Sequence, residues 1–427
     1  MFSNLLCGLL YAVIQGQAAR AHSQVWDVAA VLQCTNNPAG PLSPLAGYAT
    51  CPLPVDDEAL KSGVWSPWSY PPVCMRPKNK SGPKLCAFTL SSLRGEGGMS
   101  IVTTPRVASD LAKAARDPDI AWLEKQRGSP FMADRPKPYE IRALPGKGLG
   151  VMAAEPIRRG QVVMVALPIL LQLADTKPWD YRDVFRLLQE ASIQLPRREK
   201  EALLQMAKRG RGYVVDDIMK TNSFQVTING VGHSGLYPEI SVWIYVHART
   251  HLVVNARSCI VRYSPSTLIV EVVAYRDIER GEELSLSYIP LNLLSEQRQD
   301  VIKGWGFNCT CALCRDTEAT KVSDSHRARI QAIFDELDAP ENRTHEKVQA
   351  AMTELEELVE EEGLAAQIGD LHTIFADLYL DMGDSQKARE HAGLALGMLR
   401  QFAGWDNDRT NSAASLVTRL EEEKKNV

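Results

Sequence analysis

Apolar and polar residues alternate in short runs between residues 139 and 288, which is the pattern of half-buried strands. Glycine-containing turns separate these runs and favour a β-rich core of short strands. The predicted strands cover residues 140–144, 151–154, 162–173 and 263–288, with a glycine-rich turn at 145–150 and a turn at 279–282. Residues 180–220 break the alternation, because their apolar residues recur at helical spacing. A helical insertion is predicted there, and its apolar stripe is expected to pack in the core.

Apolar residues keep helical spacing from Cys314 to the end of the chain. The predicted helices cover residues 325–336, 346–361, 366–382 and 385–402. Small and aromatic residues between Ala376 and Leu396 are spaced as in a tetratricopeptide helix pair, and a generic helical hairpin explains the same spacing.

Residues 23–135 are rich in proline, glycine and serine, and an irregular region is predicted, with helices at 105–116 and 120–127. The fold class is therefore α+β: small sheets with a helical insertion, an irregular cysteine-containing N-terminal region and an all-α C-terminal domain. A length of 427 residues suits two or three such domains.

The net charge of −4 and the absence of a basic stripe argue against direct nucleic-acid binding. No apolar run reaches the roughly 20 residues of a membrane span. Leu5 to Ile14 is apolar and Ala19-Arg20-Ala21 follows, which predicts a signal peptide over residues 1–22 and secretory entry. A buried N-terminal helix or a wrongly chosen start codon is the alternative.

The cysteines form two groups. Cys34, Cys51, Cys74 and Cys86 are widely spaced, and in a secreted chain they predict two disulfides with three possible connectivities. Outside the secretory pathway they are four unrelated thiols.

The second group centres on Cys309, Cys311 and Cys314, whose spacing suits three corners of a tetrahedral zinc site. Disulfide pairing is the alternative. Tyr288 ends a predicted strand shortly before this group, and Trp305 and Phe307 lie between them.

Together these motifs resemble the SET domain, the fold of protein lysine methyltransferases. Residues 146–150 (GKGLG) resemble its first motif, and residues 274–288 (AYRDIERGEELSLSY) resemble its last. Residues 305–314 resemble its zinc-binding post-SET segment. The helical insertion and helical C-terminal domain resemble the SET subfamily that has a MYND finger and a tetratricopeptide-like tail, but no MYND finger is present. The similarity is greatest to fungal SET proteins.

The resemblance implies a chain that transfers methyl groups from S-adenosylmethionine to a lysine of a protein substrate, histone or non-histone. It implies Tyr288 as the catalytic residue and a structural zinc ion bound by Cys309, Cys311 and Cys314. Zinc needs a fourth ligand, and Cys259 is the candidate for it, although Cys259 does not align with the family's cysteine. Tyr275 is expected to have a packing role. The cofactor-binding residues that it implies are Lys147, Gly148, Leu149, Gly150 and Phe307.

Residues 242–260 depart from the family, because the Asn-His pair that holds the cofactor is missing there. We hypothesise that a retained intron or a misplaced splice junction produced this segment; finding these codons in the mature transcript would disprove it. The alternative function is a SET-fold protein-binding module without catalysis.

The predicted domains are a signal peptide (residues 1–22), the irregular N-terminal region (23–135), a SET domain (139–290), a post-SET zinc segment (291–315) and a helical domain (323–427). Secretion conflicts with catalysis, because disulfide formation in an oxidising lumen competes with zinc binding for the same thiolates. The alternative location is the nucleus or cytoplasm.

Overall fold

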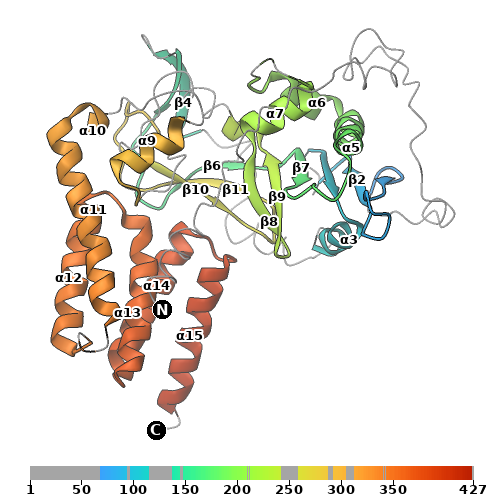
Figure 1. Ribbon diagram of the computed structural model, residues 1–427. Helices are drawn as coiled ribbons and strands as arrows, with labels where there is room; N and C mark the ends of the chain where they lie inside the picture. Colours follow the sequence, from blue (N-terminus) through green and yellow to red (C-terminus); the bar gives the residue numbers. More distant parts are fainter. Residues whose placement is uncertain are drawn as a thin grey trace.

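The computed structural model describes residues 68–93, 97–114, 137–144, 148–208, 210, 212–241, 258–286, 292–303, 312–339, 341 and 343–425. Within these residues a β-rich part lies beside a bundle of long helices (Figure 1).

The largest sheet has six strands in the order β1-β2-β3-β7-β9-β8. Only the pairing of β3 with β7 is parallel, and the other neighbours are antiparallel. The strands cover Val73–Met75, Leu85–Leu90 and Met99–Thr103 (β1–β3), then Leu170–Leu173 (β7), Phe224–Ile228 (β8) and Val231–Leu236 (β9).

Both faces of this sheet are buried, so successive side chains of β2 enter different cores. Phe88 and Leu90 join one core and Leu85 and Ala87 the other, as the two-residue period of a strand requires. Helices α5 (Tyr181–Gln194), α6 (Arg197–Gln205) and α7 (Val214–Asn222) cover the second face.

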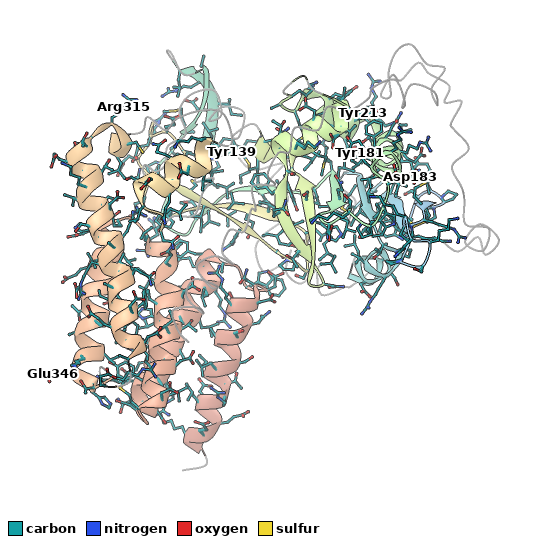
Figure 2. The ribbon with its side chains drawn as sticks, viewed as in Figure 1. Tyr139, Tyr181, Asp183, Tyr213, Arg315 and Glu346 are labelled. Carbon is teal, nitrogen blue, oxygen red and sulfur yellow. A yellow bond between two sulfur atoms is a disulfide. The ribbon has the colours of Figure 1, made fainter. Side chains whose placement is uncertain are left out.

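The helical covering is itself closely packed. The rings of Phe185 and Tyr213 lie 3.6 Å apart, and Tyr181 donates a hydrogen bond of 3.3 Å to Asp216. Figure 2 shows Tyr181 and Tyr213 together on the side of the β-rich part away from the helical bundle. These contacts agree with the prediction that the apolar stripe of residues 180–220 is core packing.

Two smaller sheets complete the β-rich part. Strands β10 (Cys259–Tyr263), β11 (Val270–Ala274) and β6 (Val162–Ala166) form an antiparallel sheet. Strands β4 (Tyr139–Leu144) and β5 (Gly148–Ala153) form a hairpin. Helix α3 (Pro105–Ala114) contributes Val107 and Leu111 to the core shared with these sheets.

The C-terminal part is helical. It contains α9 (Ser295–Lys303), α10 (Ala312–Arg315), α11 (Thr317–Asp338), α12 (His345–Glu361), the short 3₁₀ helix η5 (Ala365–Gln367), α13 (Ile368–Asp381), α14 (Ser385–Phe402) and α15 (Asp408–Lys425). Helices α11–α15, which we call the tail, form the bundle of Figure 1.

A buried arginine joins the tail to the three-stranded sheet. Arg262 of β10 donates to Glu271 of β11 at 2.6 Å, and both side chains are under one-tenth exposed. Its guanidinium also donates to the main-chain oxygens of Arg400 and Gln401 in the last turn of α14. The positive charge thus lies at the negative end of the α14 dipole.

Further polar contacts surround this arginine. Asp406 accepts hydrogen bonds from the hydroxyls of Ser264 and Ser266 at 2.7 and 2.6 Å. Ala366 donates its N–H to the Tyr275 hydroxyl at 3.0 Å, and the Tyr275 ring lies 6.0 Å from that of Phe402. The tail is therefore fixed to the sheet by hydrogen bonds at several points.

The α+β class with small sheets and a helical C-terminal region is confirmed. The prediction of an irregular N-terminal region is wrong for residues 73–103, which supply three strands of the large sheet. The strand predicted over 162–173 is two strands in different sheets, because the Pro168 segment separates β6 from β7. Helix α15 was not predicted as a separate element.

Of the predicted disulfides, the structure has one between Cys74 and Cys86, which face each other across β1 and β2. Cys34 and Cys51 lie outside the described residues, as do the signal segment 1–22 and the helix predicted at 120–127. The described residues contain no helix long and apolar enough to cross a membrane.

The Cys74–Cys86 disulfide should stabilise the edge of the large sheet. It closes a loop with a sequence separation of 12, for which the chain-entropy model gives about 3 kcal/mol. Cys74→Ala should lower the thermal midpoint of the oxidised protein by several degrees and have little effect in a reducing buffer. Equal midpoints of the wild-type protein with and without reductant would contradict a stabilising bond.

Two histidines pack against each other inside the tail. The Nδ1 atoms of His372 on α13 and His391 on α14 lie 3.1 Å apart. One ring must therefore donate and the other accept. Burial lowers the pKa of both rings, and the nearby His391 helps to lower that of His372 to about 4. Glu356, Glu390 and Lys387 are charged neighbours of the pair.

Acid should weaken the tail through this pair. The folded-state pKa of His372, about 4, is below the ordinary 6.5, so the unfolded chain binds the proton more tightly and stability falls as the pH drops from about 6.5 toward 4. The loss due to His372 between about pH 6.5 and pH 4.5 should be roughly 2 kcal/mol.

Urea unfolding followed by circular dichroism at both pH values measures this loss. His372→Gln should flatten the pH dependence, and His345→Gln, at an exposed position outside the pair, is the control. An unchanged slope in His372→Gln would assign the acid sensitivity to other groups.

Candidate functional site

Residues 282–286 run antiparallel beside β5 and form the centre of the candidate site. Gly281 and Leu284 donate their N–H groups to the carbonyl oxygens of Ala153 and Val151, each at 2.8 Å. Ala153 donates to Glu282, also at 2.8 Å. The end of the predicted last SET motif is thereby held against the strand that carries the first motif.

The other edge of this segment meets the start of β10. Cys259 donates its N–H to the Ser285 carbonyl at 3.0 Å, and Ser285 donates its own N–H to the Ser258 hydroxyl at 2.8 Å. A parallel bridge joins Cys259 and Leu286. Three segments far apart in sequence, 148–153, 258–259 and 282–286, therefore lie side by side; we call them the site frame.

A tight turn sets the entry of residues 282–286 into the frame. Glu282 accepts from the Glu279 N–H at 2.7 Å and from Arg276 at 2.6 Å. The Arg276 hydrogen bond holds the pKa of the Glu282 carboxyl below its ordinary value. Gly281 has φ +87°, in the left-handed region that favours glycine. The turn predicted at residues 279–282 is confirmed.

Gly150 lies in β5 opposite Arg142, not in the turn where the sequence pattern placed it. A Cβ atom at Gly150 would lie 2.3 Å from Leu144 Cδ1 and 2.8 Å from Leu144 Cγ. A packing contact across the hairpin therefore requires glycine at this position, independently of any ligand.

The structure describes part of the predicted site. Gly148, Leu149 and Gly150 belong to β5. Cys314 belongs to α10 and is half-buried. The remaining predicted site residues, except Cys259, lie outside the described residues: Lys147, Tyr288, Phe307, Cys309 and Cys311.

Cys259 is fully buried in the apolar core that includes Val151, Ala153 and Leu286. Burial raises the pKa of its thiol to about 12. Within the residues described, no group of three or more His, Cys, Asp or Glu side chains is placed to hold a metal ion.

Tyr275 is 4% exposed and binds the tail through its hydroxyl, which agrees with its predicted packing role. Arg298 of α9 is fully buried, although the sequence does not predict that this residue is buried. The surrounding SEQRQD run reads as an exposed polar helix, so no local pattern indicates that this arginine is buried.

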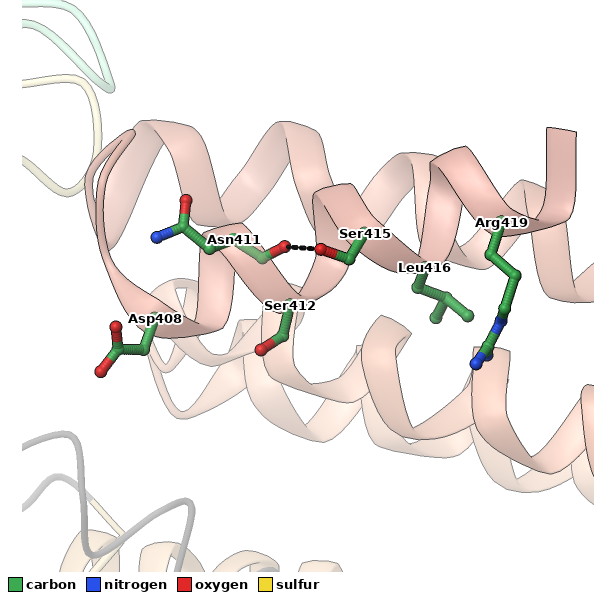
Figure 3. Close-up of a pocket in the computed structure, with 6 residues that line it drawn as sticks. All are labelled: Asp408, Asn411, Ser412, Ser415, Leu416 and Arg419. Atoms are coloured by element: carbon green, nitrogen blue, oxygen red, sulfur yellow. Dashed lines mark hydrogen bonds between the residues drawn. The ribbon is translucent and has the colours of Figure 1, made fainter. Parts of the chain in front are cut away.

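A hollow of about 700 Å³ lies along α15 (Figure 3). Leu416 is the one apolar residue among the six that line it. The lining consists of Asp408, Asn411, Ser412, Ser415, Leu416 and Arg419, none of which belongs to the site frame.

Residues 148–289 match the family model of the SET domain. The match begins with β5 and extends just past residues 282–286, so it spans the whole site frame. The fold and this match define a β-rich domain of the SET class with a helical tail.

Several yeast proteins are similar to parts of the chain. "Histone-lysine N-methyltransferase set5" of Schizosaccharomyces pombe is 24% identical over 195 residues, 45% of this chain and 56% of the relative. "Histone-lysine N-methyltransferase SET5" of Candida albicans is 34% identical over 73 residues, 16% of this chain and 15% of the relative. "SET domain and MYND-type zinc finger protein 6" of S. pombe is 37% identical over 60 residues, 14% of this chain and 12% of the relative.

The chain spans 56% of the length of the first of these relatives and 15% or less of the other two. The similarity is therefore to SET-domain proteins, and it covers only parts of each chain.

The packing and ligand roles of Gly150 can be separated by a pair of substitutions. Gly150→Ala should destabilise the hairpin by about 1–3 kcal/mol, because the new methyl overlaps Leu144. Leu144→Ala in the same chain removes the overlapping atoms and should restore most of the stability. Thermal unfolding of both variants, with Leu144→Ala alone as the control, measures this.

Titration of the double variant with S-adenosylmethionine then reports only on contact with the ligand. If Gly150→Ala alone is as stable as the wild-type protein, the overlap with Leu144 does not constrain this position.

Proposed function

We propose that this protein is an S-adenosylmethionine-dependent protein lysine N-methyltransferase. The observation that carries the proposal is the site frame, in which the two ends of the SET match lie side by side. This arrangement supports a single site built from both motifs, because neither end of the match forms a site by itself.

Chain connectivity limits where the proposed catalytic tyrosine can lie. Tyr288 follows Leu286 by two residues, and two residues span at most about 7 Å. Lys147 directly precedes β5. Since residues 282–286 run antiparallel to β5, the chain leaves the frame toward Tyr288 at the same end at which Lys147 enters it.

S-adenosylmethionine, when bound, supplies an electrophilic methyl group and leaves as a neutral thioether. The chain has to bind it, align it with the target amine and exclude water. We assign its binding to Lys147, Gly148, Leu149, Gly150 and Phe307.

Tyr288 would accept the substrate lysine at the other side of the site. Its hydroxyl would orient the neutral amine toward the methyl group and stabilise the ammonium charge that forms on transfer. No covalent intermediate with the protein is required.

We further propose a structural zinc ion bound by Cys309, Cys311 and Cys314. Three closely spaced thiols fit zinc chemically. Cys259 is the proposed fourth ligand, and it lies at a buried position next to Ser258. The proposed ion would order the segment that contains Phe307 and has no role in the chemical step.

We propose a protein substrate and a location in the nucleus or cytoplasm. The names of the relatives specify histone lysine as what those proteins modify, and we extend to this chain only the broader class, a lysine of a histone or another protein. In this proposal the tail is tetratricopeptide-like, helices α5–α7 split the SET domain, and no MYND finger is present. Secretion receives no support from the relatives.

The alternative function is a SET-fold protein-binding module without catalysis. It is favoured by one observation, the absence of an Asn-His pair between residues 242 and 260. Buried polar contacts to the cofactor would then be missing, and affinity should fall accordingly. Titration with S-adenosylmethionine by calorimetry discriminates the two functions, since the binding module should release no heat.

Tyr288→Phe should lower methyl transfer to a lysine substrate by at least tenfold, since one hydroxyl that orients the amine is lost. S-adenosylmethionine affinity should stay within about twofold, because the hydroxyl faces the amine and not the cofactor. Transfer of a radiolabelled methyl group to histone and non-histone proteins measures the first quantity, and calorimetry the second.

Tyr275→Phe is the matched control. It removes the hydroxyl bonded to Ala366 and should cost about 1 kcal/mol of stability without changing the transfer rate per folded molecule. Full activity of Tyr288→Phe would remove Tyr288 from the reaction, whereas wild-type protein with neither activity nor cofactor binding would favour the binding module.

A further inference from the structure

Helix α9 is attached to the tail by a carboxylate at its first turn. Asp324 of α11 accepts hydrogen bonds from the Ser295 N–H at 2.8 Å and from the Ser295 hydroxyl. A carboxylate at this position satisfies a free N–H of the first turn and faces the positive end of the helix dipole. The tail thus supplies the cap of a helix that lies outside it.

Arg298, one turn further along α9, is fully buried. Its Nη1 donates to the Leu293 carbonyl at 2.7 Å, and its Nη2 lies 3.8 Å from the Asp324 carboxylate. Its Nε and Nη2 have no hydrogen-bond acceptor among the residues that the structure describes. A buried guanidinium with unused donors is unfavourable for stability, so this arginine is better explained by a positional role than by stabilisation of the fold.

A second polar layer continues into the tail next to Asp324. Ser323 and Arg327 of α11 both contact Glu362, which ends α12, at 2.6 and 2.8 Å. His326 lies 3.1 Å from the same carboxylate. The network therefore runs from the start of α9 through α11 to the end of α12.

Arg298 is the only buried side chain among those that the structure describes in α9. The contacts of Ser295 and Arg298 with Asp324 link the first turn of α9 to the tail.

Helix α9 lies in sequence between the two proposed halves of the site. Tyr288 precedes Ser295 by seven residues, and Phe307 follows Lys303 by four. Helix α9 is thus joined to both residues by short stretches of chain, and displacements of about 1 Å in an active site lower rates by roughly a hundredfold.

We propose that Asp324 and Arg298 are positioning residues, through which the tail holds α9 and thereby sets the geometry of the methyl-transfer site. This inference rests on the proposed function for its catalytic consequence. Its structural part, the attachment of α9 through Asp324, stands independently.

Asp324→Asn tests the proposal, with Asp370→Asn as the matched control. Asp370 of α13 is also paired with an arginine, Arg409 of α15, at 2.7 Å, but both residues belong to the tail. Each substitution removes one carboxylate charge from an arginine pair, and only Asp324 contacts α9. Ser295→Ala removes a single hydroxyl from the same contact and serves if Asp324→Asn does not fold.

Hydrogen exchange followed by mass spectrometry is the first measurement. In Asp324→Asn the amides of 293–303 and 282–286 should exchange about tenfold faster, while those of the large sheet stay unchanged. Asp370→Asn should accelerate exchange in α13 and α15 and leave residues 282–303 at wild-type rates. Equal effects of the two substitutions on residues 282–303 would overturn the proposal.

Methyl transfer is the second measurement. Asp324→Asn should lower kcat about tenfold with a smaller change in KM for the protein substrate, and Asp370→Asn should change neither by more than about twofold. Wild-type protein without activity would refute the proposed function, and the exchange pattern would still decide whether Asp324 positions α9. Normal kcat in Asp324→Asn, with active wild-type protein, would overturn the catalytic part.

Discussion

The pairing of residues 282–286 with β5 on one side and with the start of β10 on the other is the constraint on which the candidate site depends. Each partner comes from a different part of the sequence, and backbone hydrogen bonds join all three segments. The bonds are between main-chain atoms, so many side-chain substitutions leave them intact. The reciprocal contacts of Ser258 and Ser285 add side-chain bonds at the point where the third segment joins.

The tail is attached to the three-stranded sheet, to Tyr275 and to α9 through charges and hydrogen bonds. Arg262 binds the end of α14, Tyr275 binds the N–H of Ala366, and Asp324 binds the start of α9. Such contacts are directional, so they define the orientation of the tail more sharply than an apolar contact of similar area does. Helices that are distant from the frame in sequence thereby become part of its support.

Local patterns predicted the elements of the fold better than their assembly. The helices over 346–361 and 385–402 and the turn at 279–282 agree with the structure to within a residue, because spacing and glycine position are local properties. The large sheet could not be predicted in this way, since β3 pairs with β7 across more than sixty residues. Helix α15 is rich in serine, threonine and glutamate, and its helical period is weak in sequence.

The same distinction applies to the site. The order of the motifs identified residues 148–150 as part of the site and predicted the turn at 279–282. The close approach of Leu144 to position 150 depends on the register of the β4–β5 hairpin, which is not a local property of the sequence. Cys259 was predicted as a ligand because cysteine is a common zinc ligand, and the structure places it in an apolar core, which is a property of the assembled fold. The contacts of Arg262 with α14 join residues about 140 positions apart and have no local pattern.

Arg298 shows how support for the site differs from stability of the fold. A methionine of similar length would fill the same space without burying a charge, and such replacements are often neutral or stabilising. An apolar side chain, however, has no donor for the Leu293 carbonyl and no charge for Asp324, so it would leave the rotation and axial position of α9 less defined. The buried arginine is thus better understood as fixing one position of α9 on the tail, at some expense in free energy, than as a stabilising contact.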